Sequence, residues 1–450
     1  MRTLPSSVDS GLVLLPFRGI RYAPDRVSTI ADVTSPPYDV IGAGTLDELL
    51  AADPHNIVRL ILPGGDAAAA AALLRSWLES GVLVRDPAPA LYVYEQNGPG
   101  FLQRGIIGLV GVGAPGIHPH ENVMPGPVAG RRELMAATEA NLEPIFLVYN
   151  GSSGSGSDGS GSGSSGSGGS GSGSSASRLV DEVTTGTQPF LTTVTGDGVT
   201  HRLWRVTDPA AHASVAADLA GRTALIADGH HRYAAYEDLR SRMRAAGRGD
   251  GPWDYGLAFL VDGDFYPPRL GAIHRVLPGL PFESAVSRAS AGFAVRALPD
   301  DPGTAAEALP DDFGAAMSAL AAAGAEGPAF LLAGRSGFRL LTAPDPARLA
   351  SVMPTGASQR WRSLDTAVLQ ELLLTDMWGI HDNEHDVLIS HDAQEAVDLA
   401  RAADGTAVVC NPVPFSAVKE IAAHGECVPR KSTSFGPKPR TGLVLRTFGG

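Results

Sequence analysis

The chain has few cysteines, no long apolar run and no excess of basic charge. Two cysteines, Cys410 and Cys427, are too few for a disulfide framework in 450 residues. No stretch of about 18 apolar residues could span a bilayer, and the first ten residues lack the charged and apolar regions of a secretory signal. The net charge of −13 argues against attraction to a nucleic-acid backbone. We therefore expect a cytoplasmic protein with neither a membrane nor a nucleic-acid partner.

One segment, residues 151–177, consists of Gly and Ser apart from Asp158 and Ala176. Such a composition cannot bury apolar surface and behaves as a flexible tether, with an average span of roughly 30 Å. Its ends can therefore remain neighbours, and we interpret it as an insertion, with an interdomain hinge as the alternative. The predicted organisation is an N-terminal α/β region at 1–150 packing with the core, the insertion at 151–177, a core at 178–280, and a C-terminal α/β region at 281–450.

Short apolar runs alternate with Ala- and Leu-rich segments, which indicates an α/β fold of the mixed α+β type. No Gly-x-Gly-x-x-Gly sequence opens a predicted helix and no Gly-Lys-Ser/Thr loop is present. These absences argue against Rossmann and Walker nucleotide sites. Helices are predicted at 66–80, 364–374, 393–402 and 415–424. Strands are predicted at 12–17, 56–62, 90–95, 105–112, 144–149, 200–206, 224–227, 255–261, 272–277, 329–332, 407–410 and 441–447.

Residues 228–232, Asp-Gly-His-His-Arg, lie where a short apolar run meets a helix-compatible segment. Gly229 permits a tight turn there, and the unpaired amides at the start of a helix form an anion site. Arg232 can bind two phosphate oxygens, and either histidine can carry the proton that moves when an alcohol attacks phosphorus. Asp228 can act as a base or hold Mg²⁺. The structural alternative is a helix cap formed by Asp228, with both histidines satisfied in the core.

Three other polar groups have weaker patterns. His118 and His120 face the same way on an extended segment and could share a metal or a phosphate, unless they belong to a solvated loop. Residues 430–441 combine four cations with four hydroxyls, which suits a phosphate or carboxylate but equally an exposed basic loop. His381 and His385 lack the zincin order, so residues 381–386 are interpreted as a polar loop.

Several motifs in one order resemble the domain-of-unknown-function family 1015. The resemblance runs nearly end to end, and the Gly/Ser tract is this chain's own departure, because relatives have a short connection there. The motifs are PPYDVI at 36–41, NIVRL at 56–60, HE at 120–121, PGP at 125–127, ANLEPIF at 140–146, IADGHHRY at 226–233, HR at 274–275, PRKSTSF at 429–435, PK at 437–438 and TGLV at 441–444.

The turn at 228–232 also resembles the phosphate-binding turn of the ParB and sulfiredoxin superfamily, whose Gly-x-x-Arg is matched by Gly229 and Arg232. His230 stands where sulfiredoxins need a cysteine, and the acidic chain shows no basic helix-turn-helix region. The free serine kinases, which share the Asp-Gly-His-His-Arg sequence, are the nearest branch. The resemblance implies a ParB/sulfiredoxin-like nucleotide-binding core with additional α/β elements. It also implies phosphoryl transfer between ADP or ATP and the hydroxyl of a small substrate such as free serine, or the reverse from phosphoserine.

The resemblance and the local charges together predict three sets of site residues. The predicted catalytic residues are Asp228, which would also lie at Mg²⁺, and His231, with Asp39 and Glu121 as candidates for a separate acidic base. The predicted nucleotide-phosphate ligands are Gly229, His230, Arg232 and His120. The predicted substrate ligands are Lys431, Ser432, Thr433 and Lys438.

Two other functions stay open at this level. One is a metal-dependent phosphoesterase that uses water as the nucleophile. The other is a non-catalytic regulatory protein that binds a nucleotide without consuming it. In the phosphoesterase, the metal ligands would be His118, His120, His230 and Asp228.

Overall fold

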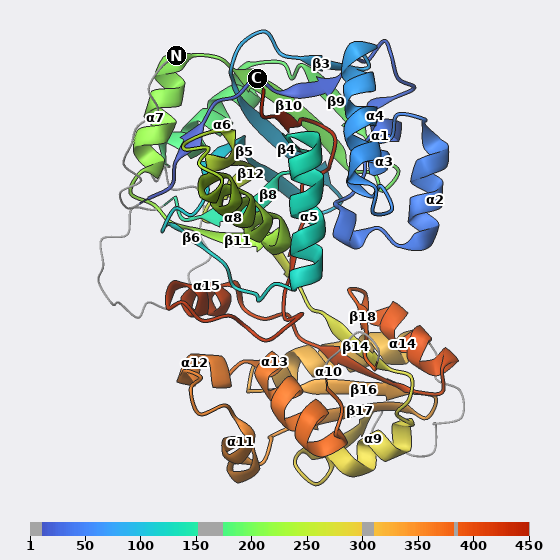
Figure 1. Ribbon diagram of the computed structural model, residues 1–450. Coiled ribbons are helices and arrows are strands. Elements are labelled where there is room, and N and C mark those ends of the chain that lie inside the picture. Colours follow the sequence, from blue (N-terminus) through green and yellow to red (C-terminus); the bar gives the residue numbers. More distant parts are fainter. Residues whose placement is uncertain (1–10, 152–173, 299–309, 382–385, 450) are drawn as a thin grey trace. The chain divides into compact units, whose positions relative to one another are not determined.

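The computed structural model describes residues 11–151, 174–298, 310–381 and 386–449, and confirms the mixed α/β class (Figure 1). Contacts group the chain into unit 1 (residues 1–119, 123–268 and 437–450) and unit 2 (120–122 and 269–436). The predicted segments 1–150, 178–280 and 281–450 stay a prediction. Residues 152–173 of the Gly/Ser tract and 382–385 of the predicted polar loop lie outside the described residues. Within the described ranges, no helix is long and apolar enough to cross a membrane.

The described strands of unit 1 form a nine-stranded mixed sheet in the order β6-β11-β8-β12-β5-β4-β10-β9, with β1 beside β5. Strand β11 runs antiparallel to β8, whereas β12 is parallel to β8. These central strands are buried almost throughout, which explains their continuous apolar sequences. The strands are β1 (Leu14–Leu15), β4 (Leu91–Gly98), β5 (Phe101–Gly111), β6 (Ile117–His118), β8 (Ile145–Tyr149), β9 (Leu191–Val194), β10 (Thr200–Val206), β11 (Ala224–Asp228) and β12 (Tyr255–Asp262).

Helix α8 packs on β8 and β12 and lies beside α5 (Figure 1). Two small sheets pair β2 (Ile20–Tyr22) with β3 (Leu83–Arg85), and β7 (Ala140–Asn141) with β21 (Arg446–Thr447). The helices of unit 1 are α1 (Ile30–Val33), η1 (Tyr38–Val40), α2 (Ala43–Ala52), α3 (Val58–Ile61), α4 (Ala67–Glu79), α5 (Pro125–Thr138), α6 (Ser175–Gly186), α7 (Pro209–Leu219), α8 (His230–Ala245) and η2 (Pro252–Asp254).

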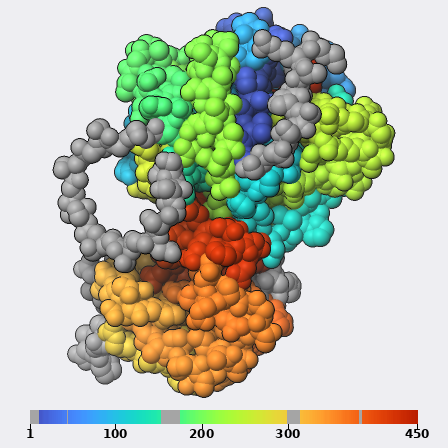
Figure 2. All heavy atoms as spheres, turned by 90° about the vertical axis from the view of Figure 1, so that its left-hand side faces the viewer, coloured from blue at the N-terminus to red at the C-terminus, as the bar shows by residue number. Residues whose placement is uncertain are grey.

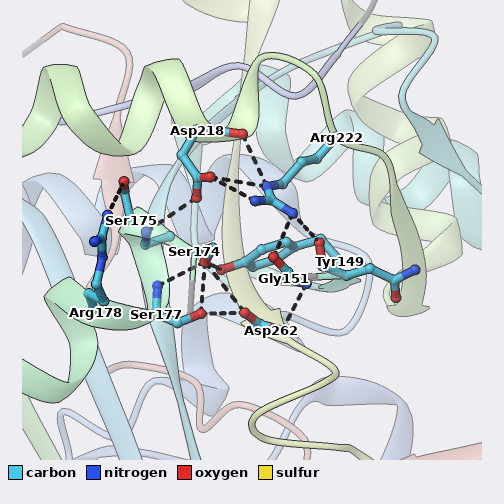
Figure 3. A network of polar contacts seen from close by, with 11 residues as sticks. Tyr149, Gly151, Ser174, Ser175, Ser177, Arg178, Asp218, Arg222 and Asp262 are labelled. Atoms are coloured by element: carbon cyan, nitrogen blue, oxygen red, sulfur yellow. Dashed lines mark hydrogen bonds and ion pairs between the residues drawn. The ribbon is translucent and has the colours of Figure 1, made fainter. Parts of the chain in front are cut away.

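Both described flanks of the Gly/Ser tract belong to unit 1 and contact one buried carboxylate, that of Asp262 (Figure 3). The amide of Gly151 donates to Asp262 Oδ1 at 3.0 Å, and the hydroxyls of Ser174 and Ser177 donate to Oδ2. Tyr149, which ends β8, contacts Ser174 through its hydroxyl at 3.2 Å. The hydroxyls and the amide thus satisfy a carboxylate that would be costly to bury alone.

The described strands of unit 2 form a six-stranded antiparallel sheet in the order β15-β17-β16-β19-β14-β18, and β13 pairs with β20. Helix α15 packs beside α12, and its red atoms are visible at the surface in Figure 2. The strands are β13 (Arg269–Gly271), β14 (His274–Leu277), β15 (Ala294–Leu298), β16 (Phe330–Gly334), β17 (Gly337–Thr342), β18 (Leu388–Ser390), β19 (Thr406–Cys410) and β20 (Ser434–Gly436). The helices are α9 (Phe282–Ala289), α10 (Pro310–Gly324), α11 (Pro346–Val352), α12 (Gln359–Arg362), α13 (Asp365–Ala367), η3 (Val368–Trp378), α14 (Ala393–Ala402) and α15 (Phe415–Ala423).

The strand predicted at residues 56–62 is wrong, because residues 58–61 of this run form helix α3. The side chain of Asn56 accepts a hydrogen bond from the amide of Val58 at 2.9 Å and donates to the carbonyl of Asp32 at 2.7 Å. Side-chain bonds of this kind start a helical turn that the apolar sequence alone does not reveal. The strand predicted at 441–447 is only partly present, since β21 covers its last two residues.

Candidate active site

The turn at residues 228–232 connects strand β11 to helix α8, as the sequence predicts. The pairing of β11 with β8 shifts register between Ile226 and Asp228, so the strand carries a β-bulge immediately before the turn. A bulge redirects the side chains that follow it. Gly229 then adopts a left-handed conformation, with φ +95°, and α8 begins without a side-chain cap. The positive end of the α8 dipole lies at this turn and favours a negatively charged group.

Gly229 is required both by its backbone angle and by its neighbours. A Cβ atom at this position would lie 3.0 Å from Ile145 Cγ2 and 3.2 Å from the guanidinium of Arg232. We expect Gly229→Ala to lower the free energy of unfolding by about 2–4 kcal/mol, from left-handed strain plus overpacking. Urea denaturation measures this loss.

Gly247, just beyond the other end of α8, supplies the matched control. Its φ is also positive, at +73°, but a Cβ atom there would meet nothing within 4 Å. Gly247→Ala should therefore cost only the strain, about 1–2 kcal/mol. Equal losses for the two variants would show that crowding at Gly229 is unimportant.

Four predicted site residues form one ionic network in unit 1. Asp228 Oδ2 pairs with Arg232 at 2.5 Å, and Asp228 Oδ1 pairs with the ammonium of Lys438 at 2.6 Å. The same ammonium pairs with Asp39 Oδ2 at 2.7 Å. Asp39 comes from η1 and Lys438 from the last segment of the chain, so three distant parts of the sequence meet at the turn.

Arg232 is directed inward. Its side chain is 2% exposed, and its guanidinium donates to the carbonyl of Pro144 as well as to Asp228. The predicted contact of Arg232 with a nucleotide phosphate stays a prediction, and it would require these internal bonds to be exchanged. In the structure, Arg232 instead orients Asp228 and adds positive charge to the turn.

Burial and charge act against each other on the carboxylates of this network. Burial raises the pKa of Asp228, but the charges of Lys438 and Arg232 outweigh it and hold that pKa below its ordinary value. Glu143 is also buried, and burial raises its pKa, despite the opposing charges of Arg232 and Arg131. Asp228 is therefore the ionised partner of both cations at neutral pH.

Sequence reasoning missed Glu143 as a member of this site. Its carboxylate accepts from the amide of Tyr38 at 3.1 Å and lies 3.7 Å from Arg131. The available signal was an acidic residue inside an apolar run, between Leu142 and Pro144. An acidic residue in such a run needs a buried partner, which only the fold can supply.

Arg232 also lines a small pocket. The Nε of Arg232 has no hydrogen-bond partner among the described residues. One donor is therefore available to a small acceptor, such as a water molecule or a ligand oxygen. The pocket is lined by Arg131, Leu134, Met135, Ala140, Leu142, Glu143 and Arg232.

The two histidines of the turn differ in their surroundings. Burial, together with the charges of His231, Lys438 and Arg232, lowers the pKa of His230 to about 3, so its ring is neutral at pH 7. His231 is partly exposed, and its Nε2 accepts a hydrogen bond from the amide of Met124 at 3.1 Å. Met124 is the N-cap of α5. The amino ends of two helices, α5 and α8, are thus linked through His231, and both favour negative charge.

Buried neutral histidines should make the stability of unit 1 sensitive to acid. Burial lowers the pKa of His201 to about 4 and that of His230 to about 3. In the unfolded chain, both imidazole rings bind a proton below about pH 6.5. In the folded chain they stay neutral until the pH is much lower. The free energy of unfolding should therefore fall as the pH is lowered from 6.5 towards 4. Urea denaturation across this range measures the slope, and His201→Gln should make it shallower. If the pH dependence of the free energy of unfolding is the same in His201→Gln as in the wild type, His201 is not a buried neutral histidine.

A second cluster of predicted site residues lies within unit 2. His120 is buried, and its Nε2 lies 2.8 Å from the hydroxyl of Thr433. Glu121 Oε1 accepts from the amide of Lys431 at 3.3 Å. Lys431 has a φ of +53°, a left-handed angle that costs energy for a residue with a side chain. Ser432 is buried and donates to the carbonyl of Pro429. The roles predicted for these residues stay predictions.

Asp228 does not fit the part of a Mg²⁺ ligand in this arrangement. Each of its oxygens already contacts a protein cation, at 2.5 and 2.6 Å. Across the described ranges, no group of three or more His, Cys, Asp or Glu residues could hold a metal ion. Mg²⁺ carried into the site by a nucleotide would supply charge neutralisation for the phosphates.

A family model described as Protein of unknown function (DUF1015) matches residues 14–157 and 170–367. The chain belongs to this family. The family predicted from the sequence motifs is therefore confirmed. No curated protein matches the sequence significantly.

Three solved structures are similar to this DUF1015 chain at low identity. A free serine kinase in complex with AMP has 14% identity, coverage of 71% of this chain and 84% of that chain, and a TM-score of 0.32. A free serine kinase mutant in complex with ADP has 12% identity, coverage of 75% and 90%, and a TM-score of 0.34. SbnI with C-terminal truncation, from Staphylococcus aureus, has 12% identity, coverage of 73% and 82%, and a TM-score of 0.32. Similarity at this level carries no argument about activity.

Proposed function

We propose that this DUF1015 protein binds the phosphates of ADP or ATP at the turn of residues 228–232. We further propose that it transfers phosphate between the nucleotide and a small hydroxyl substrate such as free serine, in either direction. The observation that carries the proposal is the uncapped start of α8 at Gly229, beside an ionic network of Asp39, Asp228 and Lys438. The first supplies an anion site, and the second supplies acid-base groups.

The surroundings of each group suggest its part in the reaction. The amides at the start of α8 and the neutral ring of His230 would face the nucleotide phosphates. His231 would orient the start of α5 through its bond to Met124. Lys438 would contribute positive charge beside the phosphates, while its ammonium stays paired with Asp39 and Asp228.

Asp39 is the better placed of the two carboxylates to accept the substrate's proton. Its side chain is 38% exposed, whereas that of Asp228 is 8% exposed. A base must reach the hydroxyl, and only an accessible carboxylate can do so. Asp228 would then keep Lys438 and Arg232 in position. Glu121, the other candidate for the base, lies in unit 2. So do the predicted substrate ligands Lys431, Ser432 and Thr433. Their roles in the proposed reaction are supported by the sequence alone.

Phosphorus NMR tests the proposal with the full-length protein. The protein is incubated with ATP or ADP, Mg²⁺ and serine, and separately with phosphoserine and ADP. Nucleotide turnover that depends on serine supports phosphoryl transfer. Hydrolysis of phosphoserine without nucleotide would indicate a phosphoesterase, and saturable nucleotide binding without turnover would indicate a regulatory protein.

A pair of variants separates catalysis from binding. We expect Asp39→Asn to lower the turnover rate by about 10²–10⁴-fold, the usual contribution of a general base, with nucleotide affinity nearly retained. Asp47→Asn is the matched control, because Asp47 is an exposed carboxylate in α2. If both variants turn over at the wild-type rate, Asp39 is not the base.

A further inference from the structure

The ammonium of Lys438 occupies a position between two carboxylates. It lies 2.7 Å from Asp39 Oδ2 and 2.6 Å from Asp228 Oδ1, and its side chain is 19% exposed. Two carboxylates that converge on one point form the kind of position that a divalent cation prefers. Here the positive charge at that point belongs to the protein.

The choice of lysine is informative in this chain. Lysine and arginine together number 35, but only three of these residues are lysines: Lys419, Lys431 and Lys438. A compact ammonium can donate to two carboxylates from different directions, whereas the flat guanidinium of arginine suits one carboxylate in a forked geometry. Lys438 makes one such single contact to each of two converging carboxylates.

The segment that carries Lys438 is anchored on both sides of it. The carbonyl of Pro437 accepts from the side chain of Gln96 at 3.4 Å. Arg440 donates to the hydroxyl of Thr34 at 2.7 Å and to the carbonyl of Thr34 at 2.8 Å. These bonds hold the backbone on both sides of Lys438. The fold of unit 1 therefore positions the ammonium between the two carboxylates.

A metal ion bound by Asp228 would meet two positive charges. The guanidinium of Arg232 contacts one oxygen of Asp228, and Lys438 contacts the other. Like charges at such distances repel strongly in a buried site. Binding of a divalent ion would first require the ammonium to leave.

We propose that Lys438 is a resident cation that takes the place of a protein-bound divalent metal between Asp39 and Asp228. Any Mg²⁺ used at the turn then arrives with the nucleotide. The arrival of Mg²⁺ with the nucleotide rests on the proposed function, whereas the role of Lys438 as a resident cation concerns the protein alone. Removal of Lys438 would leave two carboxylates, which form a site for a hard divalent ion such as Mg²⁺ or Mn²⁺.

Electron paramagnetic resonance of Mn²⁺ tests the first statement without any nucleotide. The full-length wild-type protein should leave Mn²⁺ free. Lys438→Met should bind one Mn²⁺ roughly tenfold or more tightly than the wild type, because the competing charge is gone. Lys438→Met combined with Asp39→Asn should lose that gain. Lys419→Met, which removes a lysine from α15, is the control and should behave as the wild type.

Two results would overturn the inference. One is tight Mn²⁺ binding by the wild-type protein, and the other is a folded Lys438→Met variant that gains no affinity. Thermal unfolding establishes whether each variant is folded. Because Mn²⁺ is measured without nucleotide, a failure of the proposed phosphoryl transfer would leave this result unaffected.

A second measurement covers the case in which Lys438→Met does not fold. Lysine labelled with ¹⁵N at Nζ gives at most three ammonium signals in this protein. Lys419→Met and Lys431→Met identify two of them, so the third is Lys438. This signal should be slowly exchanging and unchanged by added Mg²⁺. A Lys438 signal that exchanges with solvent like a free lysine, or that moves with Mg²⁺, would contradict the proposal.

Discussion

Arg232→Met is expected to lower the free energy of unfolding by about 3–5 kcal/mol, the usual cost of removing one partner of a buried ion pair. Arg232 and Asp228 are 2% and 8% exposed as side chains, so bulk water has little access to the carboxylate that loses its partner. The carbonyl of Pro144 would also lose its donor. Methionine keeps much of the side-chain volume of arginine, so the loss of stability measures mainly the removal of the guanidinium charge. Urea denaturation followed by circular dichroism measures it.

The same helix offers a matched control. Arg242 pairs with Asp238 at the same spacing of four residues and at 2.9 Å, but its side chain is 63% exposed. Arg242→Met should change the free energy of unfolding by less than about 1 kcal/mol. If Arg232→Met costs no more than this control, the buried network does not stabilise the turn.

Removal of residues 437–450 is expected to abolish cooperative folding of unit 1. Arg446 donates to the side chain of Asn141 at 2.9 Å and to the carbonyl of Pro252 at 2.7 Å, and hydrogen bonds of a charged donor contribute about 1.5–3 kcal/mol each. Leu443, Val444 and Leu445 are almost fully buried, and each such side chain contributes about 1.5–3 kcal/mol. The combined loss is comparable with the whole stability of a domain, about 5–15 kcal/mol.

Thermal unfolding and limited proteolysis check this prediction. The truncated chain should lose the unit 1 transition, whereas unit 2 contains its own hydrophobic core, including Leu331, Leu340 and Val409, and should still unfold cooperatively. Removal of residues 449–450 alone is the control and should leave both transitions intact. A truncated protein with an unchanged unit 1 transition would show that the segment is dispensable.

Local sequence was sufficient wherever the local pattern and the tertiary environment agree. The apolar runs at 144–149 and 200–206 and the helical segment at 393–402 correspond to β8, β10 and α14. The glycine at 229 was expected to form a tight turn, and its φ of +95° confirms it. In each case, the apolar period or the backbone requirement of glycine is a property of neighbouring residues.

Local sequence was insufficient where a side chain's partner is distant. The apolar run at 56–62 gave the wrong prediction because Asn56 bonds across to Asp32, 24 residues away. The residues next to Glu143 in the sequence do not indicate that it contacts Arg131 and the amide of Tyr38. The sequence could suggest Lys438 as a ligand from its charge, but not the carboxylates that it joins.

From its residues alone, this protein was assignable to a mixed α/β class, to the DUF1015 family and to a turn suited to an anion, because periodicity, motif order and glycine are readable along the chain. The fold decided that Arg232 faces inward, that Glu143 belongs to the site and that Lys438 joins Asp39 to Asp228. These three outcomes depend on burial and on charges brought together from residues 39 to 438. Such interactions act through space and leave no periodic trace in the sequence.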